Sequence, residues 1–238
     1  MSSSSQHTAV TSSLKASIEG FLNSISLPPE VSKVVQDAIQ AVQQHNGEQG
    51  KGLPVGEKAP DFTLLDQTGK PIALSSALRE GPVVLTFYRG SWCPFCNLQL
   101  RAYSQHLPSW RERFGAQLIA VTPEAADPSD KASASASASS SEETSFPVLT
   151  DADQTVIVDY RLQFTPIESY LALIKNAFAL DLAQRNADRS NNLPVPGTFV
   201  IDREGVIRAR FVDPNYMTRM EPSVITEALE RISASSSS

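Results

Sequence analysis

The chain has 238 residues, of which 41% are hydrophobic and 19% are charged, and its formal net charge is −6. This composition is typical of a globular protein with one large domain, or one domain with extensions. The lack of a basic cluster argues against nucleic acid or an anionic membrane as a partner. No apolar run approaches the ~20 residues of a membrane helix, and the first residues lack the pattern of a secretory signal. We therefore expect a cytoplasmic protein.

Residues 1–52 are predicted to form an extension that precedes the main domain. Residues 1–13 are rich in Ser and Thr and are expected to be disordered. Apolar residues recur at helical spacing over 14–25 and again over 28–42. These two helices are expected to pack on the core or on a partner subunit, which leaves a homodimer open. Polar and glycine residues at 45–52 are typical of a linker.

The main domain is expected over residues 53–233, followed by a short disordered tail at 234–238. The predicted elements are a strand–turn–strand unit at 61–74, a buried strand at 83–88, a helix ending at 114, a strand at 117–122, a short strand at 146–149, helices at 151–162 and 166–182, a strand ending at 202, its hairpin partner at 206–212 and a helix at 221–232. Residues 126–145 are of low complexity and are expected to form a mobile surface loop. A parallel half followed by an antiparallel hairpin and a helix predicts an α/β fold of thioredoxin-like type. Its mixed central sheet is flanked by helices.

The only two cysteines, Cys93 and Cys96, lie between the buried strand and the helix that follows it. Thiolate is the reactive form of cysteine, and only roughly 3% of an unperturbed thiol is ionised at neutral pH. Pro94 fits the first helical position, which puts Cys93 at the N-cap, where backbone N–H groups and the helix dipole favour a thiolate. This geometry predicts that Cys93 attacks and Cys96 resolves the adduct to a disulfide. The alternative is a pair of inert buried thiols, but their place at a helix start disfavours it.

Two residues beside the pair have open roles. Trp92 either fills space in the core or shapes the surface beside Cys93, and large aromatic side chains favour the first role. Arg89 is the nearest cation in sequence and can lower the thiol pKa, although its direction is not visible in the sequence. The histidine and cysteine spacings do not fit a zinc site, so no metal and no cofactor are expected.

Several stretches together resemble the peroxiredoxin-like proteins of the AhpC/TSA type, within the thioredoxin-fold superfamily. They lie at 55–62, 87–90, 97–101, 146–149 and 196–202, and the motif Trp-Cys-Pro-Phe-Cys at 92–96 is similar to a thioredoxin-fold active site. The resemblance implies reduction of hydroperoxides by a thiolate, through a sulfenic acid and a disulfide, with thioredoxin or glutathione as reductant. It also implies that Pro196 is cis and touches the disulfide.

The chain departs from the family pattern in its peroxide pocket. Aligned on the strand end, Arg89 stands where the family has Pro, Cys93 where it has Thr, and Cys96 where it has the peroxidatic cysteine. Pro196 occupies the place of the pocket arginine. The alignment therefore favours Cys96 as nucleophile, while helix-cap physics and the thioredoxin motif favour Cys93, which we prefer. Arg89 and Arg101 are the candidate pocket cations.

Three functions follow from these patterns. The first is a thiol-dependent antioxidant peroxidase, favoured by the resemblance along the chain. The second is a thiol–disulfide oxidoreductase acting on protein or small-molecule disulfides, favoured by the Cys-Pro-Phe-Cys motif and Pro196. The third is a non-catalytic, redox-sensing adaptor that binds a partner through residues 14–44, which the intact cysteine pair disfavours.

Overall fold

A computed structural model describes residues 13–45, 47–125 and 146–236. The predicted low-complexity loop at 126–145 and nearly all of the predicted N-terminal tail lie outside the described residues. A seven-stranded sheet has the order β2-β1-β5-β4-β3-β8-β9, and a separate ribbon pairs β6 with β7. The strands are β1 (Thr63–Asp66), β2 (Pro71–Ala73), β3 (Val83–Phe87), β4 (Gln117–Thr122), β5 (Val148–Thr150), β6 (Gln163–Phe164), β7 (Leu193–Pro194), β8 (Gly197–Ile201) and β9 (Ile207–Val212).

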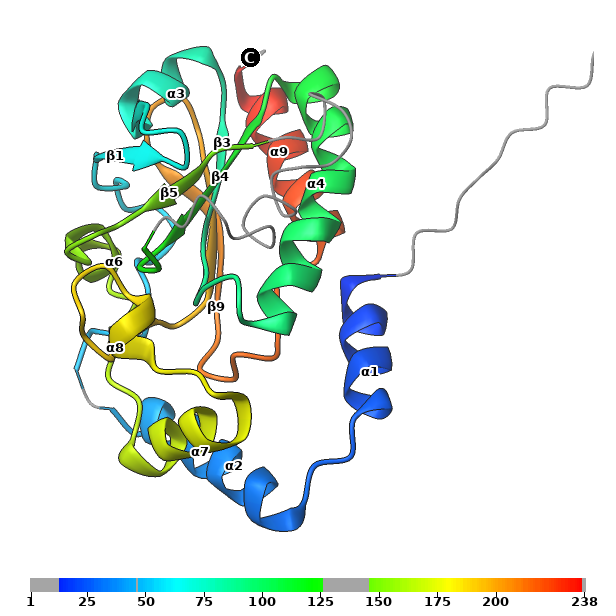
Figure 1. Ribbon diagram of the computed structural model, residues 1–238. Helices are drawn as coiled ribbons and strands as arrows, with labels where there is room; N and C mark the ends of the chain where they lie inside the picture. The colour runs from blue at the N-terminus through cyan, green and yellow to red at the C-terminus, as the bar shows by residue number, and fades with distance from the viewer. Residues whose placement is uncertain (1–12, 46, 126–145, 237–238) are drawn as a thin grey trace, which may run out of the picture.

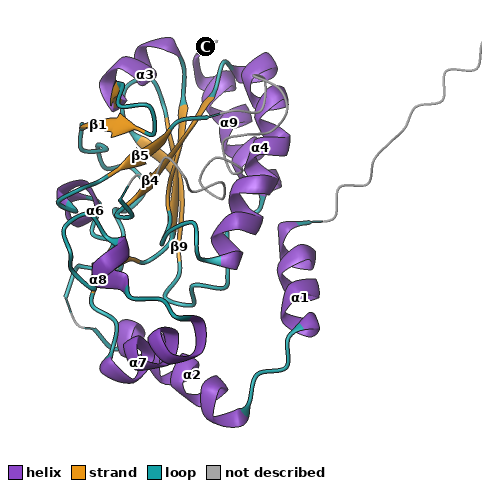
Figure 2. Cartoon of the chain, viewed as in Figure 1, coloured by secondary structure: helices purple, strands orange, loops and turns teal. Residues whose placement is uncertain are grey.

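The sheet is mixed, as predicted. β3 runs parallel to β4, and β4 runs parallel to β5. β8 is antiparallel to both β3 and β9, and β1 is antiparallel to both β2 and β5. Helices lie on both sides of the strands (Figure 2), which confirms the predicted α/β architecture. The helices are α1 (Leu14–Ser24), α2 (Pro29–Gln43), α3 (Leu74–Glu80), α4 (Pro94–Phe114), α6 (Thr155–Asp159), α7 (Glu168–Phe178), α8 (Leu182–Arg185) and α9 (Pro222–Ser236).

The strand β3 is buried on both faces, as its unbroken apolar sequence predicts. Successive side chains of a strand point to opposite faces. Val84 therefore packs in the cluster formed with α1, α4 and α9. Val83, Leu85 and Phe87 pack in the cluster on the other face, with α3 and α6. This places β3 between two cores, and the chain leaves it directly into the cysteine motif.

The N-terminal helix α1 lies beside the start of α4 (Figure 1) and packs against it. The backbone N–H groups of Leu14 and Lys15 donate to the Glu221 carboxylate at 3.1 and 2.6 Å. A carboxylate at a helix N-terminus satisfies unpaired N–H groups and complements the helix dipole. Leu14 and Ile18 are buried in the cluster with α4. The extension thus packs on the main domain, which is one of the two arrangements predicted for it.

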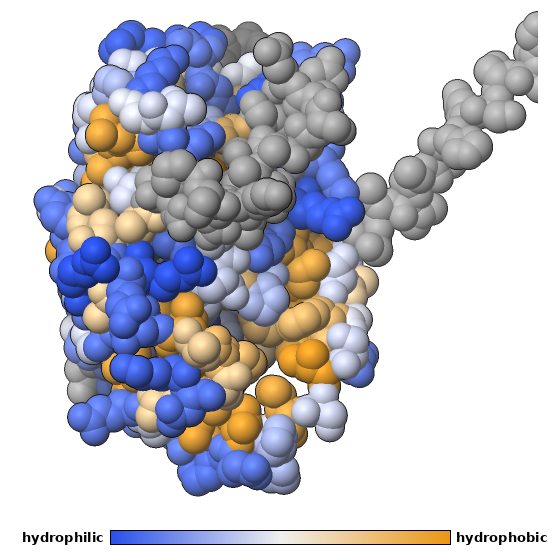
Figure 3. All heavy atoms as spheres, viewed as in Figure 1, coloured by the Kyte–Doolittle hydropathy of each residue, from blue (hydrophilic) through white to orange (hydrophobic). Residues whose placement is uncertain are grey.

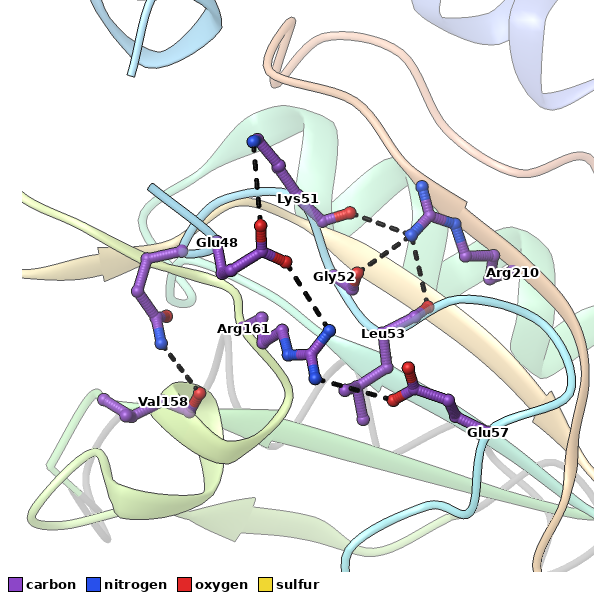
Figure 4. Close-up of polar contacts among 9 residues, drawn as sticks. Glu48, Lys51, Gly52, Leu53, Glu57, Val158, Arg161 and Arg210 are labelled. Atoms are coloured by element: carbon purple, nitrogen blue, oxygen red, sulfur yellow. Dashed lines mark hydrogen bonds and ion pairs between the residues drawn. The ribbon is translucent and has the colours of Figure 1, made fainter. Parts of the chain in front are cut away.

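The segment between α2 and β1, predicted to be a linker, is tied to the domain by polar contacts (Figure 4). Arg210 Nη1 donates to the carbonyl groups of Lys51, Gly52 and Leu53 at 2.9, 3.0 and 3.2 Å. Arg161 forms ion pairs with two glutamates, at 3.6 Å to Glu48 and 3.7 Å to Glu57. These contacts fix the start of the segment that leads from α2 into the sheet.

The helical insert between β5 and β8 is more broken than predicted. The helix expected over 151–162 is only α6, because Gln154 at its N-cap and Arg161 after it adopt positive φ values of 59° and 56°. The helix expected over 166–182 ends at Phe178, because Ala179 is left-handed at φ 51°. α8 then begins separately at Leu182. None of these positions is a glycine, so the sequence carried no signal for the breaks.

The C-terminal helix is longer than predicted. α9 continues to Ser236, so residues 234–236, expected in a disordered tail, are helical. Over the part of the chain that the structure covers, no helix combines the length and apolar character needed to cross a bilayer.

Candidate active site

The cysteine pair lies where β3 passes into α4. Cys93 is the N-cap of α4, with φ −90° and ψ 111°, and Pro94 occupies the first helical position, as predicted. The backbone N–H of Cys93 donates to the carbonyl of Gly90 at 3.1 Å, which closes the turn before the helix. Gly90 has φ +144°, and a Cβ there would lie 2.3 Å from Trp92 Nε1. The turn that presents the pair therefore requires glycine.

Both cysteines are reduced and buried, Cys93 at 1% exposure and Cys96 at 0%. The two sulfurs are hydrogen-bonded to each other. Two thiols in contact titrate as a pair, so the first proton lost and the second belong to the pair as a whole. The surrounding charges decide which sulfur holds the first negative charge.

Arg219 is the cation nearest to Cys96. Its Nη2 donates to Cys96 Sγ at 3.4 Å, and its Nε donates to Gln99 Oε1 at 2.6 Å. Nη1 donates to the Tyr216 and Thr218 carbonyls. Arg219 is 8% exposed and forms no ion pair with a carboxylate among the described residues. A buried guanidinium without an acidic partner favours a thiolate at the sulfur it touches.

Gln99 holds Arg219 in place. Its Nε2 donates to the hydroxyl groups of Thr86 and Thr198 at 2.9 and 3.0 Å. This leaves its Oε1 to accept the hydrogen bond from Arg219. Thr86 and Thr198 lie opposite each other in the paired strands β3 and β8. Residues of β3 and β8 therefore fix the orientation of the Arg219 guanidinium through Gln99.

Arg89 is the second buried cation, at 1% exposure. Its Cζ lies 4.8 Å from the ring centre of Trp92, 5.4 Å from that of Tyr170 and 4.2 Å from that of Tyr216. Its Nη2 donates to Tyr170 Oη at 2.6 Å. Aromatic faces stabilise a guanidinium without neutralising it, so its positive charge remains available to the cysteine pair.

These charges, together with burial and the contact between the two thiols, give Cys93 and Cys96 different pKa values. Burial alone would raise the pKa of Cys96, but the hydrogen bond from Cys93 and the charge of Arg219 outweigh it. The backbone N–H and the charge of Arg89 act in the same direction, and the pKa of Cys96 falls to about 5. Burial and the interaction with Cys96 raise the pKa of Cys93 well above its usual range, against the opposing charges of the two arginines. At neutral pH the reduced pair thus carries one negative charge, held mainly on Cys96.

A cavity of about 660 Å³ opens beside the pair. Cys93, Pro94, Trp92 and Arg89 line it, together with side chains from α1, α2 and α7, whereas Cys96 does not. The two sulfurs thus differ in position as well as charge, because Cys93 faces the cavity and Cys96 lies behind it. The sequence favoured a core role for Trp92, but such a role alone does not explain its position. Trp92 is half-buried, lines the cavity and stacks on Arg89.

Two predictions about site residues differ from the structure. Arg101 is exposed on α4 and does not line the cavity. It lies five positions after Cys96, which is about 140° around the helix axis, so its position as a pocket cation was wrong. Pro196 is buried next to β8, but the described residues contain no cis peptide bond. The expected cis state of Pro196 was therefore also wrong.

The sequence does not indicate Arg219 as a site residue, because it lies 123 positions from Cys96 and belongs to no local motif. No group of three or more side chains that could hold a metal ion occurs in the described part of the chain.

The reduced protein is expected to gain stability as the pH rises from about 5 toward the ordinary cysteine pKa of about 8.5. In that window the unfolded chain binds a proton at Cys96 that the folded protein does not, so unfolding costs up to about 1.4 kcal/mol more per pH unit. Above the ordinary cysteine pKa, Cys93 ionises only in the unfolded chain. The free energy of unfolding therefore falls again as the pH rises further. Urea unfolding of the reduced wild type and of Cys96→Ser at several pH values checks this. An identical pH dependence in both proteins would contradict it.

Comparison with known proteins identifies the family. The AhpC/TSA family model matches residues 55–210. Peroxiredoxin Q of Populus jackii is 28% identical over 153 residues, which cover 64% of this chain and 57% of that protein. Thiol-disulfide oxidoreductase ResA of Bacillus anthracis is 29% identical over 175 residues, which cover 71% of this chain and 76% of that protein.

A solved structure agrees in fold. Peroxidoxin BcpB from Mycobacterium tuberculosis superposes with a TM-score of 0.55 at 21% identity, over 76% of this chain and 98% of that one. The chain therefore belongs to the AhpC/TSA family of peroxiredoxin-like proteins with a thioredoxin fold, and it is a thiol-dependent oxidoreductase.

Proposed function

We propose that the protein reduces hydroperoxides through a disulfide cycle of Cys93 and Cys96. The observation that carries the proposal is the reduced cysteine pair. Two buried arginines favour a thiolate in this pair, and Cys93 lines a cavity. Family membership supports it, since peroxiredoxins use hydroperoxides and are regenerated by thioredoxin-type reductants. The free thiols also suit a reducing compartment, so we place the protein in the cytoplasm, as a monomer or homodimer.

In the proposed reaction Cys93 attacks and Cys96 first acts as its proton acceptor. Transfer of the Cys93 proton to the Cys96 thiolate moves the negative charge to the sulfur at the cavity wall. There the helix N-terminus and Arg89 stabilise it. Cys93 then attacks one peroxide oxygen, the O–O bond breaks, and the leaving oxygen takes a proton to become an alcohol or water. Cys93 is left as a sulfenic acid.

Cys96 completes the cycle. As its thiolate attacks the sulfur of the Cys93 sulfenic acid, the hydroxyl group leaves as water and a disulfide forms. Because the pair began as one thiol and one thiolate, it has then lost two electrons and one proton, and the second proton of the products comes from solvent. Two thiols of thioredoxin or glutathione restore the reduced pair.

A second candidate is reduction of protein or small-molecule disulfides. The Cys-Pro-Phe-Cys motif favours it, as does the similarity to a protein named as a thiol–disulfide oxidoreductase. The same attack by Cys93 on a disulfide sulfur would form a mixed disulfide, which Cys96 would resolve.

Stopped-flow oxidation of the reduced protein separates the two candidates. We expect one equivalent of hydroperoxide to consume both thiols much faster than it consumes free cysteine, while insulin disulfides are reduced slowly. Thiol loss no faster than that of free cysteine would reject the peroxidase. If insulin reduction were then fast and were lost in Cys93→Ser, the disulfide reductase would take its place.

A further inference from the structure

The helix α1 is held on the domain mainly along one side. Leu14 and Ile18 are buried in the cluster with α4, and the rings of Phe21 and Phe95 meet edge to face at 5.5 Å. On the side that faces α2 and α7, hydrophobic side chains border a hollow (Figure 3). The attachment of α1 therefore depends on its contact with α4 and on the hydrogen bonds at its first turn.

Glu221, directly before α9, provides two of those hydrogen bonds. Its two carboxylate oxygens accept from the backbone N–H groups of Leu14 and Lys15. Ser13 Oγ accepts a third, from the N–H of Ala16 at 3.1 Å. Unpaired N–H groups and the helix dipole both favour a negative charge at this position. Displacement of the Glu221 carboxylate would leave two N–H groups to water and weaken the hold of α1 on the domain.

Arg219, which contacts the thiolate, lies only two positions before Glu221. Its Nη2 donates to Cys96 Sγ, while Nη1 donates to carbonyl groups of its own loop. Met220, between the two charged residues, is buried, and its carbonyl accepts from the Tyr103 hydroxyl at 2.9 Å. A movement of the Arg219 backbone is therefore passed directly to the carboxylate that holds α1.

Oxidation of the cysteine pair removes the anion that Arg219 contacts. The reduced pair holds one negative charge, mainly on Cys96, whereas a disulfide holds none. Arg219 is then a buried cation whose described partners are the neutral Gln99 side chain and carbonyl groups. A buried charge that has lost its partner is costly. Residues 211–218 of the loop before it are half-buried, so a local movement of this loop brings the guanidinium to water.

We propose that oxidation of the cysteine pair releases α1 from α4, because Arg219 and Glu221 move together in one loop. The apolar face of α1, with Leu14 and Ile18, is then accessible only in the oxidised protein. The inference rests on the disulfide of the proposed function but needs no hydroperoxide, since the second candidate function forms the same disulfide. α1, Arg219 and Glu221 lie outside residues 55–210, which the family model matches. This redox response is thus an addition to the matched part of the domain.

Thermodynamic linkage makes the response reciprocal. If oxidation weakens the attachment of α1, a change that weakens the attachment must favour oxidation by the same factor, and such couplings commonly amount to about 5–150-fold. Glutathione disulfide is a suitable oxidant for the measurement. It takes two electrons from the pair and becomes two molecules of glutathione, which carry the one proton of the pair and one from solvent.

Hydrogen exchange of the α1 amides measures the release directly. The full chain is fully reduced or fully oxidised with glutathione, and the peptide covering residues 14–24 is compared between the two forms. We expect α1 to exchange at least about fivefold faster in the oxidised protein, while β3 exchanges equally in both. Equal exchange of α1 in the two forms would overturn the inference.

A matched pair of variants at α9 tests the carboxylate. Glu221→Ala removes both hydrogen bonds to α1, whereas Glu227→Ala removes an exposed carboxylate that pairs with Arg231 within α9 at 4.0 Å. We expect Glu221→Ala to speed α1 exchange about fivefold in the reduced protein and to change it little in the oxidised one. By linkage it should shift the glutathione equilibrium toward the disulfide by the same factor. Glu227→Ala should change neither quantity, and equal effects of the two variants would contradict the assignment.

Arg219→Met tests the connecting residue. The variant has no buried charge to expose on oxidation, so its α1 exchange should be the same in the reduced and oxidised forms. A folded Arg219→Met that keeps the wild-type difference would overturn the inference, even if hydroperoxides are reduced quickly. Redox-dependent exchange of α1 in a wild type that reacts with hydroperoxide no faster than free cysteine would reject the proposed peroxidase function and leave the response of α1 in place.

Discussion

Cys96→Ser is expected to stop turnover after one attack and to leave Cys93 as a sulfenic acid. The variant keeps the sulfur that faces the cavity but lacks the one that resolves the adduct. Both arginine charges then act on Cys93, since each already favours its thiolate. Trapping with dimedone, followed by peptide mass spectrometry, should find the adduct on Cys93. Steady-state peroxide reduction with a thioredoxin reductant should fall to background.

Cys93→Ser should be inactive in a different way. Cys96 still contacts Arg219, but it loses the hydrogen bond from Cys93, does not line the cavity and is fully buried. We therefore expect little oxidation of Cys96 and no mixed disulfide with the reductant. Near-UV circular dichroism checks that both serine variants fold. A dimedone adduct on Cys96 of Cys93→Ser, formed at the wild-type rate, would assign the attack to Cys96.

The features that depend on neighbouring residues could be predicted from the sequence. The apolar run at 83–88 indicated a strand buried on both faces, and β3 lies inside the sheet, between β4 and β8. Pro94 indicated the first helical position, which fixed Cys93 as the N-cap. In both cases a few consecutive residues determine the backbone, and no distant contact is needed.

The charge distribution of the site could not be predicted in the same way. Helix-cap physics alone places the stabilised thiolate on Cys93, but the hydrogen bond from Cys93 and the direct contact with Arg219 shift the charge to Cys96. A charged hydrogen bond in a buried site outweighs a partial helix charge. The sequence showed a proline at the position of the family's pocket arginine, and nothing in it indicated that Arg219, in the loop before α9, supplies a cation to the site.

The walls of the cavity also could not be predicted from short stretches of sequence. The sequence predicted α1 and α2 as amphipathic helices but carried no information on what they cover. Their placement depends on Glu221 at the start of α1 and on the packing of α2 against α7. The break at Ala179, which the sequence does not mark, contributes a further part of the wall.

Arg219→Met is expected to raise the pKa of the Cys96 thiol by about 1–3 units, because the variant removes a positive charge in contact with the sulfur. A methionine of similar length keeps much of the packing but donates no hydrogen bond. The thiolate fraction at pH 6 should then fall from nearly complete to between about one half and one hundredth. Ultraviolet absorbance of the thiolate, followed against pH, measures the shift directly.

Two further variants separate charge from structure. Arg219→Lys retains the positive charge without the fork of donors, so we expect a pKa between those of the wild type and Arg219→Met. Arg101→Met removes an exposed arginine from α4, five positions after Cys96, and should leave the titration unchanged, because solvent screens its charge. If folded Arg219→Met titrated like the wild type, the buried guanidinium would have no part in charging the pair. The low pKa would then rest on the hydrogen bond from Cys93, on the backbone N–H of Arg89 and on the Arg89 charge.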